Sequence, residues 1–358
     1  MNESTQLEGA APPDGAELLD GAQLLDPELV PFAAFIPEVD LSLAGLAEAR
    51  AGFVGLVTSL TQLSELVERT DHTVANSPDP NHPVVVRVHR AKNTTGTLPA
   101  IVSIHGGGYV LGSYEMDDGT FDRLCPMLEC VGVSVEYRLS PETPYPGPLE
   151  DCYAALLWTF EHAEELGIDP SRIGIGGVSA GGGLAAALAI LARDRGEVEV
   201  AFQLLECPML DDRQVTPSSQ LDHLLVWSAA SNSFGWQSYL GALYGSDSVG
   251  GSESVGGGGG SDGADGEGRD RGGIPGTAAA WREADLSGLP PAYVAVGAAD
   301  GFRDEDIAYA LRLNQAGVAT ELHVYPGVPH GVTMFLGTTW AERWQRDVDD
   351  WLRRQLHP

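Results

Sequence analysis

The chain has 358 residues, of which 43% are hydrophobic, and this is enough apolar material for a sizeable packed interior. Its 51 acidic and 20 basic residues give a formal net charge of −31 at pH 7. Proteins that bind nucleic acids gather Lys and Arg against the phosphates, so this charge balance argues strongly against a nucleic-acid partner. Such acidity mainly favours solubility and says little about a small-molecule substrate.

Residues 1–75 are expected to form one part of a cap. Apolar residues recur at helical spacing over Ala44–Glu68, as they do in an amphipathic lid helix. The chain opens without a basic region or an apolar run, so we expect no secretory signal. No stretch of about 18 uninterrupted apolar residues predicts a membrane span.

From residue 76 onward, strand-like runs alternate with helical stretches. This alternation predicts an α/β fold with a mainly parallel central sheet and helices on both of its faces. We expect residues 76–208 and 285–358 to form the two parts of one core, and residues 209–284 to be an insertion that completes the cap. The expected strands are Val84–Val88, Ala100–Ile104, Val131–Tyr137, Arg172–Gly176, Ala201–Glu206, Ala292–Val296 and Thr320–Tyr325.

A glycine-rich loop follows the second expected strand and reads H-G-G-G-Y over His105–Tyr109. Glycines leave backbone N–H groups uncovered, and acyl-transfer chemistry needs such donors where a carbonyl oxygen becomes negatively charged. We therefore predict that the N–H groups of Gly106 and Gly107 contribute to an oxyanion hole. Tyr109 and Leu111, beside this loop, are candidates for the wall of a substrate pocket.

The fourth expected strand leads into the sequence G-V-S-A-G over Gly177–Gly181, and an alanine-rich helical stretch follows. A G-x-S-x-G turn between a strand and a helix is typical of a nucleophile elbow. The glycines allow a sharp reversal of the chain, which pushes the serine hydroxyl toward the substrate. Ser179 is therefore the candidate nucleophile. The N–H of Ala180, the next residue, is the third expected oxyanion donor.

The insertion 209–284 contains aromatic residues and a long glycine-rich segment. Phe234 and Trp236 are candidates for the lining of an acyl pocket, although aromatic residues are also common in ordinary packing. Residues 245–276 are rich in Gly, Ser and Asp and contain no aromatic residue. Such a segment cannot bury enough apolar surface to offset the entropy lost on ordering. We expect a mobile loop there and interpret it as a passive insertion rather than as a gate.

A serine nucleophile needs a base within hydrogen-bond reach and a carboxylate that orients this base. In an elbow architecture the acid and then the histidine follow the serine along the chain. Asp300 directly follows an expected strand and is the candidate acid. Asp304, Glu305 and Asp306 are close competitors, but acids at the start of a helix are explained by capping and by the helix dipole.

His330 is the candidate base because it lies in the loop after the last expected strand. His323 would point from within that strand. Other histidines lie in the wrong chain order or in the wrong kind of segment, namely His72, His82, His89, His162, His223 and His357. The sequence contains no H-E-x-x-H metal pair, no complete dinucleotide motif and no P-loop, so no metal and no cofactor are expected.

Two further groups of residues are interpreted as structural. Arg138, Glu142 and Asp151 are expected to form ion pairs within the core. The cysteines have neither C-x-x-C spacing nor a histidine cluster nearby, which indicates reduced, mostly buried thiols in a cytoplasmic protein. These cysteines are Cys125, Cys130, Cys152 and Cys207.

These motifs together resemble the hormone-sensitive-lipase-like family of α/β-hydrolases, the bacterial esterases with an H-G-G-G motif. The resemblance extends over most of the chain and includes the segments Leu25–Leu29, His105–Ser113, Tyr137–Glu142, Gly177–Gly181, Leu289–Pro291, Asp300 with Arg303–Glu305, and His330–Gly331. Departures from the family pattern affect no catalytic group. They are Val178 in place of Asp or Thr, Gly301 and Phe302 in place of Pro and Leu, and Val332 in place of Phe.

The resemblance implies a serine carboxylic ester hydrolase with an α/β-hydrolase fold, a helical cap and no cofactor. Ser179, Asp300 and His330 would form its triad and cleave short- to medium-chain acyl esters through an acyl-enzyme intermediate. A homodimer through an edge of the core also fits the resemblance. Two alternatives stay open: an amidase or carbamate hydrolase with the same triad, and a non-catalytic ligand-binding protein on the same scaffold. Retention of all three groups favours the enzyme.

Overall fold

The structure of this chain is a computed structural model that describes residues 20–33, 36, 41–60, 63–75, 77–245 and 273–358. The expectation of a mobile loop falls mainly on residues 246–272, which lie outside the described residues. The first 19 residues of the expected cap segment also lie outside them. Within the described part of the chain, no helix has both the length and the apolar character that crossing a membrane requires.

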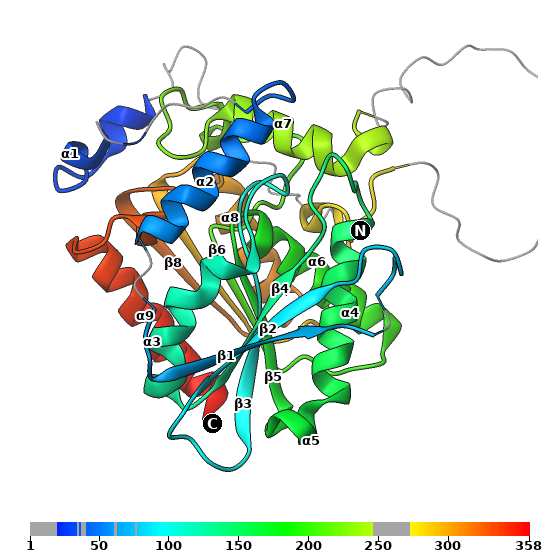
Figure 1. Ribbon diagram of the computed structural model, residues 1–358. Coiled ribbons are helices and arrows are strands. Elements are labelled where there is room, and N and C mark those ends of the chain that lie inside the picture. The colour runs from blue at the N-terminus through cyan, green and yellow to red at the C-terminus, as the bar shows by residue number, and fades with distance from the viewer. Residues whose placement is uncertain (1–19, 34–35, 37–40, 61–62, 76, 246–272) are drawn as a thin grey trace, which may run out of the picture.

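One eight-stranded sheet forms the centre of the described chain (Figure 1). Its strands lie in the order β1-β2-β4-β3-β5-β6-β7-β8. Strand β2 is antiparallel to both of its neighbours, and all other neighbouring pairs are parallel. The predicted fold class is therefore confirmed. The strands are β1 (Val67–Thr73), β2 (Val85–Ala91), β3 (Leu98–Ile104), β4 (Val131–Glu136), β5 (Ile168–Val178), β6 (Gln203–Glu206), β7 (Ala292–Ala299) and β8 (Thr320–Pro329).

The sequence analysis was wrong about strand β1. It placed these residues in the cap and extended the lid helix to Glu68. The helix α2 ends at Leu60, and β1 pairs in an antiparallel register with β2, from Val67 opposite Ala91 onward. Only Val67 of this strand is buried, and most of its other residues are polar. An edge strand of this kind contains no apolar run that would predict it from the sequence. Its pairing with β2, rather than burial of its side chains, stabilises it.

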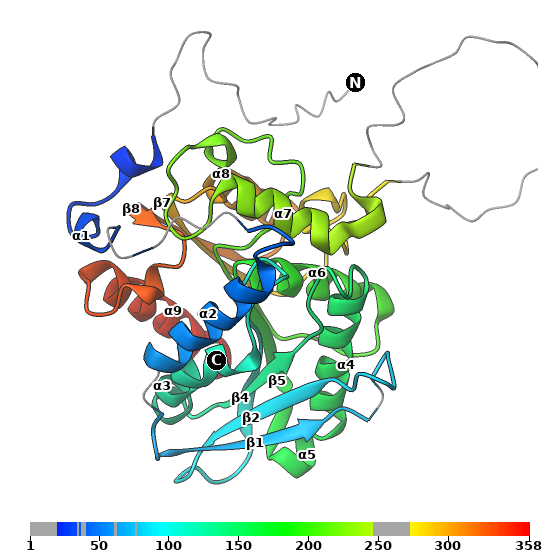
Figure 2. The ribbon, with the colours of Figure 1, turned by 45° about the horizontal axis from the view of Figure 1, so that its top comes forward.

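Helices cover both faces of the sheet, as expected (Figures 1 and 2). Helices α3 and α9 share one apolar cluster with strand residues such as Ile101 and Tyr293. Helices α4, α6 and α8 pack against the opposite face, where Val102 and Val294 point. The α-helices are α1 (Val30–Ala33), α2 (Leu46–Leu60), α3 (Asp118–Leu128), α4 (Gly147–Glu161), α5 (Ala163–Leu166), α6 (Ala180–Arg195), α7 (Ala229–Leu240), α8 (Arg303–Gln315) and α9 (Thr339–Leu356).

Short 3₁₀ helices join several of these elements. They are η1 (Gly21–Leu24), η2 (Tyr114–Asp117), η3 (Ser218–Gln220), η4 (Gly241–Leu243), η6 (Ala280–Arg282) and η7 (Val332–Met334). Elements η3, α7, η4 and η6 all lie in the expected insertion between β6 and β7. Strands β6 and β7, which flank this insertion, are parallel neighbours in the sheet.

Helices α2 and α7 lie at the end of the molecule opposite α5 (Figure 1). The guanidinium group of Arg50 on α2 donates hydrogen bonds to the carbonyl oxygens of Val110 at 2.8 Å and Ser140 at 2.9 Å. The N–H of Leu41 donates to the Oγ atom of Ser231 on α7 at 3.1 Å. The segment before β1 is thus bound both to the insertion and to the loop that follows β3.

One expected ion pair lies in the core, but Glu142, which was also expected there, is exposed. The carboxylate of Asp151 is fully buried and accepts hydrogen bonds from the Arg138 side chain at 2.7 and 2.8 Å. Glu142 instead pairs with Arg50 of α2, at 2.8 Å. All four cysteines are buried and free, in agreement with the sequence analysis.

Candidate active site

Strand β5 passes directly into helix α6 at Ser179, whose backbone has φ 60° and ψ −122°. A positive φ is unfavourable for a residue with a side chain, so neighbouring groups must hold the turn. The N–H of Ser179 donates to the carbonyl oxygen of Glu206 at 2.8 Å. The carbonyl oxygen of Ser179 accepts from the N–H groups of Gly183 at 2.9 Å and Met209 at 3.0 Å. The serine therefore occupies the strained strand-to-helix turn that the sequence predicts.

Close backbone contacts explain the two glycines of this turn. A Cβ atom at Gly177 would lie 2.3 Å from the backbone carbonyl group of Gly181. A Cβ atom at Gly181 would lie only 1.9 Å from the carbonyl oxygen of Ile104 in β3. Real Cβ atoms essentially never come within 3.0 Å of a heavy atom outside their own residue and its chain neighbours, so a larger residue would displace the elbow or the strand. The glycine pattern is therefore a packing requirement.

The glycine-rich loop after β3 lies directly beside the elbow. A Cβ atom at Gly106 would be 3.4 Å from the Cβ atom of Ser179 and 2.8 Å from the carbonyl oxygen of Val178. Among the hydrogen bonds of the described residues, none is donated by the N–H groups of Gly106, Gly107 or Ala180. The three predicted oxyanion donors thus come from adjacent segments and have no competing backbone acceptor there.

His105 holds this loop in place. Its Nδ1–H donates to the carbonyl oxygen of Gly106 at 2.8 Å, and its ring stacks on Tyr137 with a centroid distance of 4.2 Å. The hydroxyl of Tyr137 donates to the carbonyl oxygen of His105 at 3.0 Å. Burial lowers the pKa of His105 to about 4, so the ring is neutral at neutral pH. The sequence analysis assigned His105 no role beyond membership of the motif.

Ser179, His330 and Asp300 form one chain of hydrogen bonds. The Nε2 atom of His330 lies 2.9 Å from the Oγ atom of Ser179, and its Nδ1 atom lies 2.8 Å from the Oδ2 atom of Asp300. The second carboxylate oxygen of Asp300 accepts from the N–H of Phe302 at 3.0 Å. The three residues are only 5%, 5% and 2% exposed, in the order of the chain of bonds. The structure therefore brings together all three residues named from the sequence.

Two opposing effects set the protonation of His330. Burial disfavours the charged imidazolium, but the neighbouring Asp300 carboxylate favours it, with a smaller contribution from Cys207. Attraction to these groups outweighs burial, so the pKa of His330 lies well above its ordinary value of 6.5. The Asp300 carboxylate thereby makes His330 a stronger base toward the hydroxyl of Ser179.

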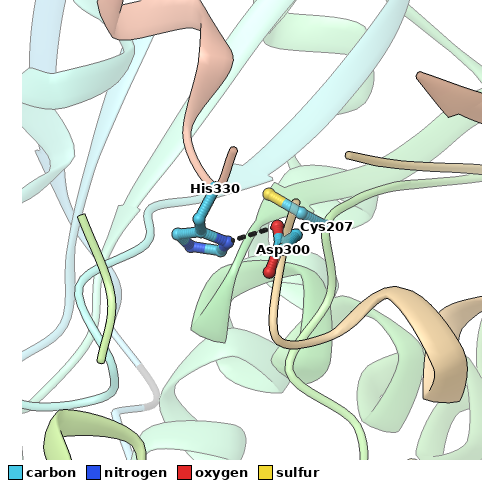
Figure 3. A group of neighbouring side chains, drawn as sticks. All are labelled: Cys207, Asp300 and His330. Atoms are coloured by element: carbon cyan, nitrogen blue, oxygen red, sulfur yellow. Dashed lines mark hydrogen bonds and ion pairs between the residues drawn. The ribbon is translucent and has the colours of Figure 1, made fainter. Parts of the chain in front are cut away.

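Cys207 is a third neighbour of this pair that the sequence analysis treated only as a buried thiol. Figure 3 shows its sulfur atom beside the carboxylate of Asp300 and the ring of His330. One ligand atom from each of these residues lies within 4.8 Å of the other two, and all three residues are buried. Thiolate, imidazole and carboxylate are ligands that zinc accepts. A metal ion there would compete with the hydrogen bond between His330 and Asp300.

Two of the three competing acids on α8 have other partners, and the buried carboxylate of the third, Asp306, accepts no hydrogen bond from the described residues. The Oδ2 atom of Asp304 accepts from the N–H of Ser218 in the insertion, at 2.7 Å. The Oε1 atom of Glu305 accepts from the N–H groups of Leu210 and Asp211 at 2.9 and 3.1 Å. These two acids anchor the start of the insertion to α8, a role different from the expected capping of that helix. Burial, with negative charge nearby, raises the pKa of Asp306 well above its ordinary value.

The four residues named for the substrate pocket lie in two groups. Trp236 has no exposed surface, and its ring packs 5.3 Å from that of Tyr109, which is itself buried. Both belong to the main apolar cluster; for Trp236 this is the packing that the sequence analysis gave as the alternative, and for Tyr109 it differs from the expected place in a pocket wall. Phe234 is half-buried and packs in a smaller cluster with Leu111 beside the glycine-rich loop. Of the four residues, only Phe234 is half-buried, and Leu111 is buried like the first two.

Comparisons with known proteins identify the family of this chain. A model of the α/β-hydrolase fold family matches residues 101–249 and 268–334. The carboxylesterase NlhH of Mycobacterium tuberculosis is 34% identical over 322 residues, which cover 87% of this chain and 89% of the relative. The arylacetamide deacetylase of Oryctolagus cuniculus is 30% identical over 356 residues, with 85% and 86% of the two chains covered.

Among solved structures, one titled bacterial heroin esterase superposes with a TM-score of 0.83 at 40% sequence identity, covering 94% of this chain and 99% of the other. An esterase of Pyrobaculum calidifontis superposes with a TM-score of 0.74 at 29% identity, covering 92% and 98%. The chain belongs to the α/β-hydrolase fold family. Its predicted place in the hormone-sensitive-lipase-like branch is confirmed.

Proposed function

We propose that this protein is a serine carboxylic ester hydrolase that cleaves short- to medium-chain acyl esters through an acyl-enzyme intermediate. The observation that carries the proposal is the continuous chain of hydrogen bonds from Ser179 through His330 to Asp300. A serine, an imidazole and a carboxylate in this order are the groups that acyl transfer requires. The names of relatives with 34% and 40% identity, a carboxylesterase and an esterase, support the same activity.

In the first half of the reaction, the Oγ atom of Ser179 attacks the ester carbonyl carbon while the Nε2 atom of His330 takes the serine proton. The carbonyl oxygen becomes an anion, which the N–H groups of Gly106, Gly107 and Ala180 stabilise. His330 then gives its proton to the alcohol oxygen as the carbon–oxygen bond breaks. The alcohol leaves, and the acyl group stays bonded to the serine.

In the second half, water attacks the acyl-enzyme by the same route. His330 takes a proton from the water, and the resulting tetrahedral anion occupies the same oxyanion hole. The carbon–Oγ bond breaks, the proton returns to Ser179, and the carboxylic acid leaves. Asp300 stays ionised throughout and stabilises the imidazolium form of His330 in both halves.

Reactivity toward esters tests the proposal directly. Purified protein should hydrolyse p-nitrophenyl acetate and butyrate, and a fluorophosphonate probe should label a single serine in the peptide that contains residue 179. The Ser179→Ala variant should lose both turnover and labelling while its circular dichroism spectrum stays unchanged. Undiminished turnover in that variant would exclude Ser179 as the nucleophile.

A second candidate activity is amide hydrolysis with the same triad. The relative named arylacetamide deacetylase, with 30% identity over most of both chains, is the observation that favours it. Amides differ from esters in their leaving group, an amine that must be protonated as it departs, and His330 is placed to do this. Turnover of p-nitroacetanilide beside p-nitrophenyl acetate, at equal enzyme concentration, separates the two activities. A carbamate substrate extends the same series.

The third alternative is a non-catalytic ligand-binding protein on this scaffold. A protein that only binds its ligand has no need for the contacts between Ser179, His330 and Asp300. Ligand binding measured by calorimetry without any turnover of the ester or amide series would favour this alternative over the hydrolase.

Three further predictions accompany the proposed activity. The cap would combine residues 1–75, apart from strand β1, with residues 209–284. The free thiols support a cytoplasmic location, since a reducing compartment keeps cysteines unpaired. A homodimer is the third, and sedimentation velocity at several protein concentrations would measure it.

A further inference from the structure

The segment Leu224–Trp227 of the insertion contacts three loops that carry proposed catalytic groups, namely the loop of Asp300, the loop of His330 and the glycine-rich loop. A Cβ atom at Gly301, next to Asp300, would be 3.1 Å from the Cδ1 atom of Leu224. A Cβ atom at Gly331, next to His330, would be 3.7 Å from the Cγ1 atom of Val226.

The third contact is the closest. A Cβ atom at Gly108, next to Gly107, would be only 2.0 Å from the Cη2 atom of Trp227. The indole therefore lies against bare backbone at Gly108. We call Leu224–Trp227 the bridge segment.

The backbone of the bridge segment is strained. Val226 has φ 72°, and the N–H of Trp227 donates to the carbonyl oxygen of Leu225 at 2.8 Å. This hydrogen bond closes a γ-turn around a positive-φ residue, a rare and strained form, and a β-branched side chain makes it less favourable still. Strain of this kind persists where surrounding contacts impose it, and it gathers at ligand sites.

Trp227 is enclosed on two sides but keeps part of its surface uncovered. Its indole lies between the glycine-rich loop and helix α7, where a Cβ atom at Gly235 would be 3.5 Å from its Cζ2 atom. The indole N–H donates to the Oδ1 atom of Asn232 at 3.4 Å. All four side chains of the bridge segment are apolar and half-buried. They present apolar surface next to the loops that carry the proposed catalytic groups.

We infer that the bridge segment sets the size limit of the substrate, with Trp227 confining the acyl group and Val226 confining the alcohol. This inference rests on the proposed function. The leaving alcohol must take a proton from His330, so it lies on the side of the histidine loop that Val226 contacts. The acyl group lies on the other side of the carbonyl carbon, toward the glycine-rich loop and the indole of Trp227.

Two substrate series separate these roles. One series varies the acyl chain of p-nitrophenyl esters from acetate to decanoate. The other keeps the acetyl group and varies the alcohol from ethyl to butyl, benzyl and naphthyl. The measured quantity is the ratio of kcat/KM values within one series, because the fraction of folded enzyme cancels from that ratio.

Trp227→Ala should raise the octanoate-to-acetate ratio by about tenfold or more, because apolar pockets discriminate by that order for a few methylene groups. It should leave the alcohol series unchanged. Trp227→Phe, which keeps a ring, should give a smaller shift in the same direction. Val226→Ala should show the opposite pattern, with a gain for bulky alcohols and no change in the acyl series.

Trp281→Ala is the matched control. This half-buried indole lies against the guanidinium of Arg312, at 5.1 Å, and outside the bridge segment. Its removal should change neither ratio. The inference is overturned if the acyl profile of Trp227→Ala equals that of the wild type, as the profile of Trp281→Ala should. It is also overturned if Val226→Ala and Trp227→Ala shift both series alike. A wild type that turns over neither series would instead remove the proposed function on which the inference rests.

Discussion

The Nε2 atom of His330 lies 2.9 Å from the Oγ atom of Ser179, although 151 residues separate the two along the chain. This contact predicts the largest single effect of any substitution. Ser179→Ala should lower kcat for p-nitrophenyl butyrate by a factor of about 10⁵ or more, as expected when a nucleophile is removed from a cooperating triad. The melting temperature should stay near that of the wild type, and a parallel thermal scan serves as the control.

The pH dependence of kcat/KM should follow the raised pKa of His330. Only the neutral ring can take the serine proton, so activity is lost as the pH falls through this pKa. Because Asp300 raises the pKa above 6.5, the acid limb should lie above that pH. Asp300→Asn should shift the limb to lower pH and lower kcat by about 10⁴-fold. An unchanged limb in this variant would contradict the role given to the carboxylate.

His105 should affect turnover through the glycine-rich loop. His105→Ala removes the hydrogen bond to the carbonyl oxygen of Gly106 and the stacking on Tyr137. We expect kcat to fall by about tenfold to a hundredfold, less than for the loss of a direct oxyanion donor. His105→Asn can still donate to Gly106 and should recover part of this loss. Equal kcat values for the two variants would mean that this hydrogen bond does not position the loop.

His105 also predicts a pH dependence of stability. Its pKa is about 4 in the folded protein and 6.5 when unperturbed. Between these values the unfolded chain binds a proton that the folded protein does not, so the free energy of unfolding falls as the pH falls. Denaturant titrations at pH 7 and pH 5 should show a smaller decrease in His105→Asn than in the wild type.

Gly181→Ala should damage the elbow far more than its single added methyl suggests. The new Cβ atom would lie 1.9 Å from the carbonyl oxygen of Ile104, so the helix start or the strand must move. We expect a loss of stability of about 1–3 kcal/mol and a loss of most activity. Gly52→Ala on α2 is the control, because nothing lies within 4 Å of its added Cβ atom. It should be neutral or stabilising by about 0.5–1 kcal/mol.

The parts of the molecule that follow local rules could be predicted from the sequence. The elbow at Ser179 needs glycines at fixed positions, Asp300 follows the apolar strand β7, and His330 follows β8, whose residues alternate between polar and apolar. Because parallel strands end at the same edge of a sheet, their order along the chain was enough to place these residues together.

The features that depend on distant partners could not be predicted. The polar strand β1 exists because β2 accepts it as a neighbour. Cys207 has a positive φ of 39° and lies beside the triad, but nothing in its local sequence marks it. The bridge segment consists of ordinary apolar residues, whose contacts with three glycines on separate loops exist only in the folded chain.

The first residue of the insertion is hydrogen-bonded to the backbone of Ser179. The N–H of Met209, where the insertion leaves the core, donates to the carbonyl oxygen of Ser179 at 3.0 Å. Any displacement of the insertion at this end therefore pulls on the backbone of Ser179, the proposed nucleophile. An exchange of this insertion between relatives would change reactivity together with selectivity if the junction lay before residue 209. A junction placed after the anchors from Glu305 to Leu210 and Asp211 would leave the attacking hydroxyl undisturbed.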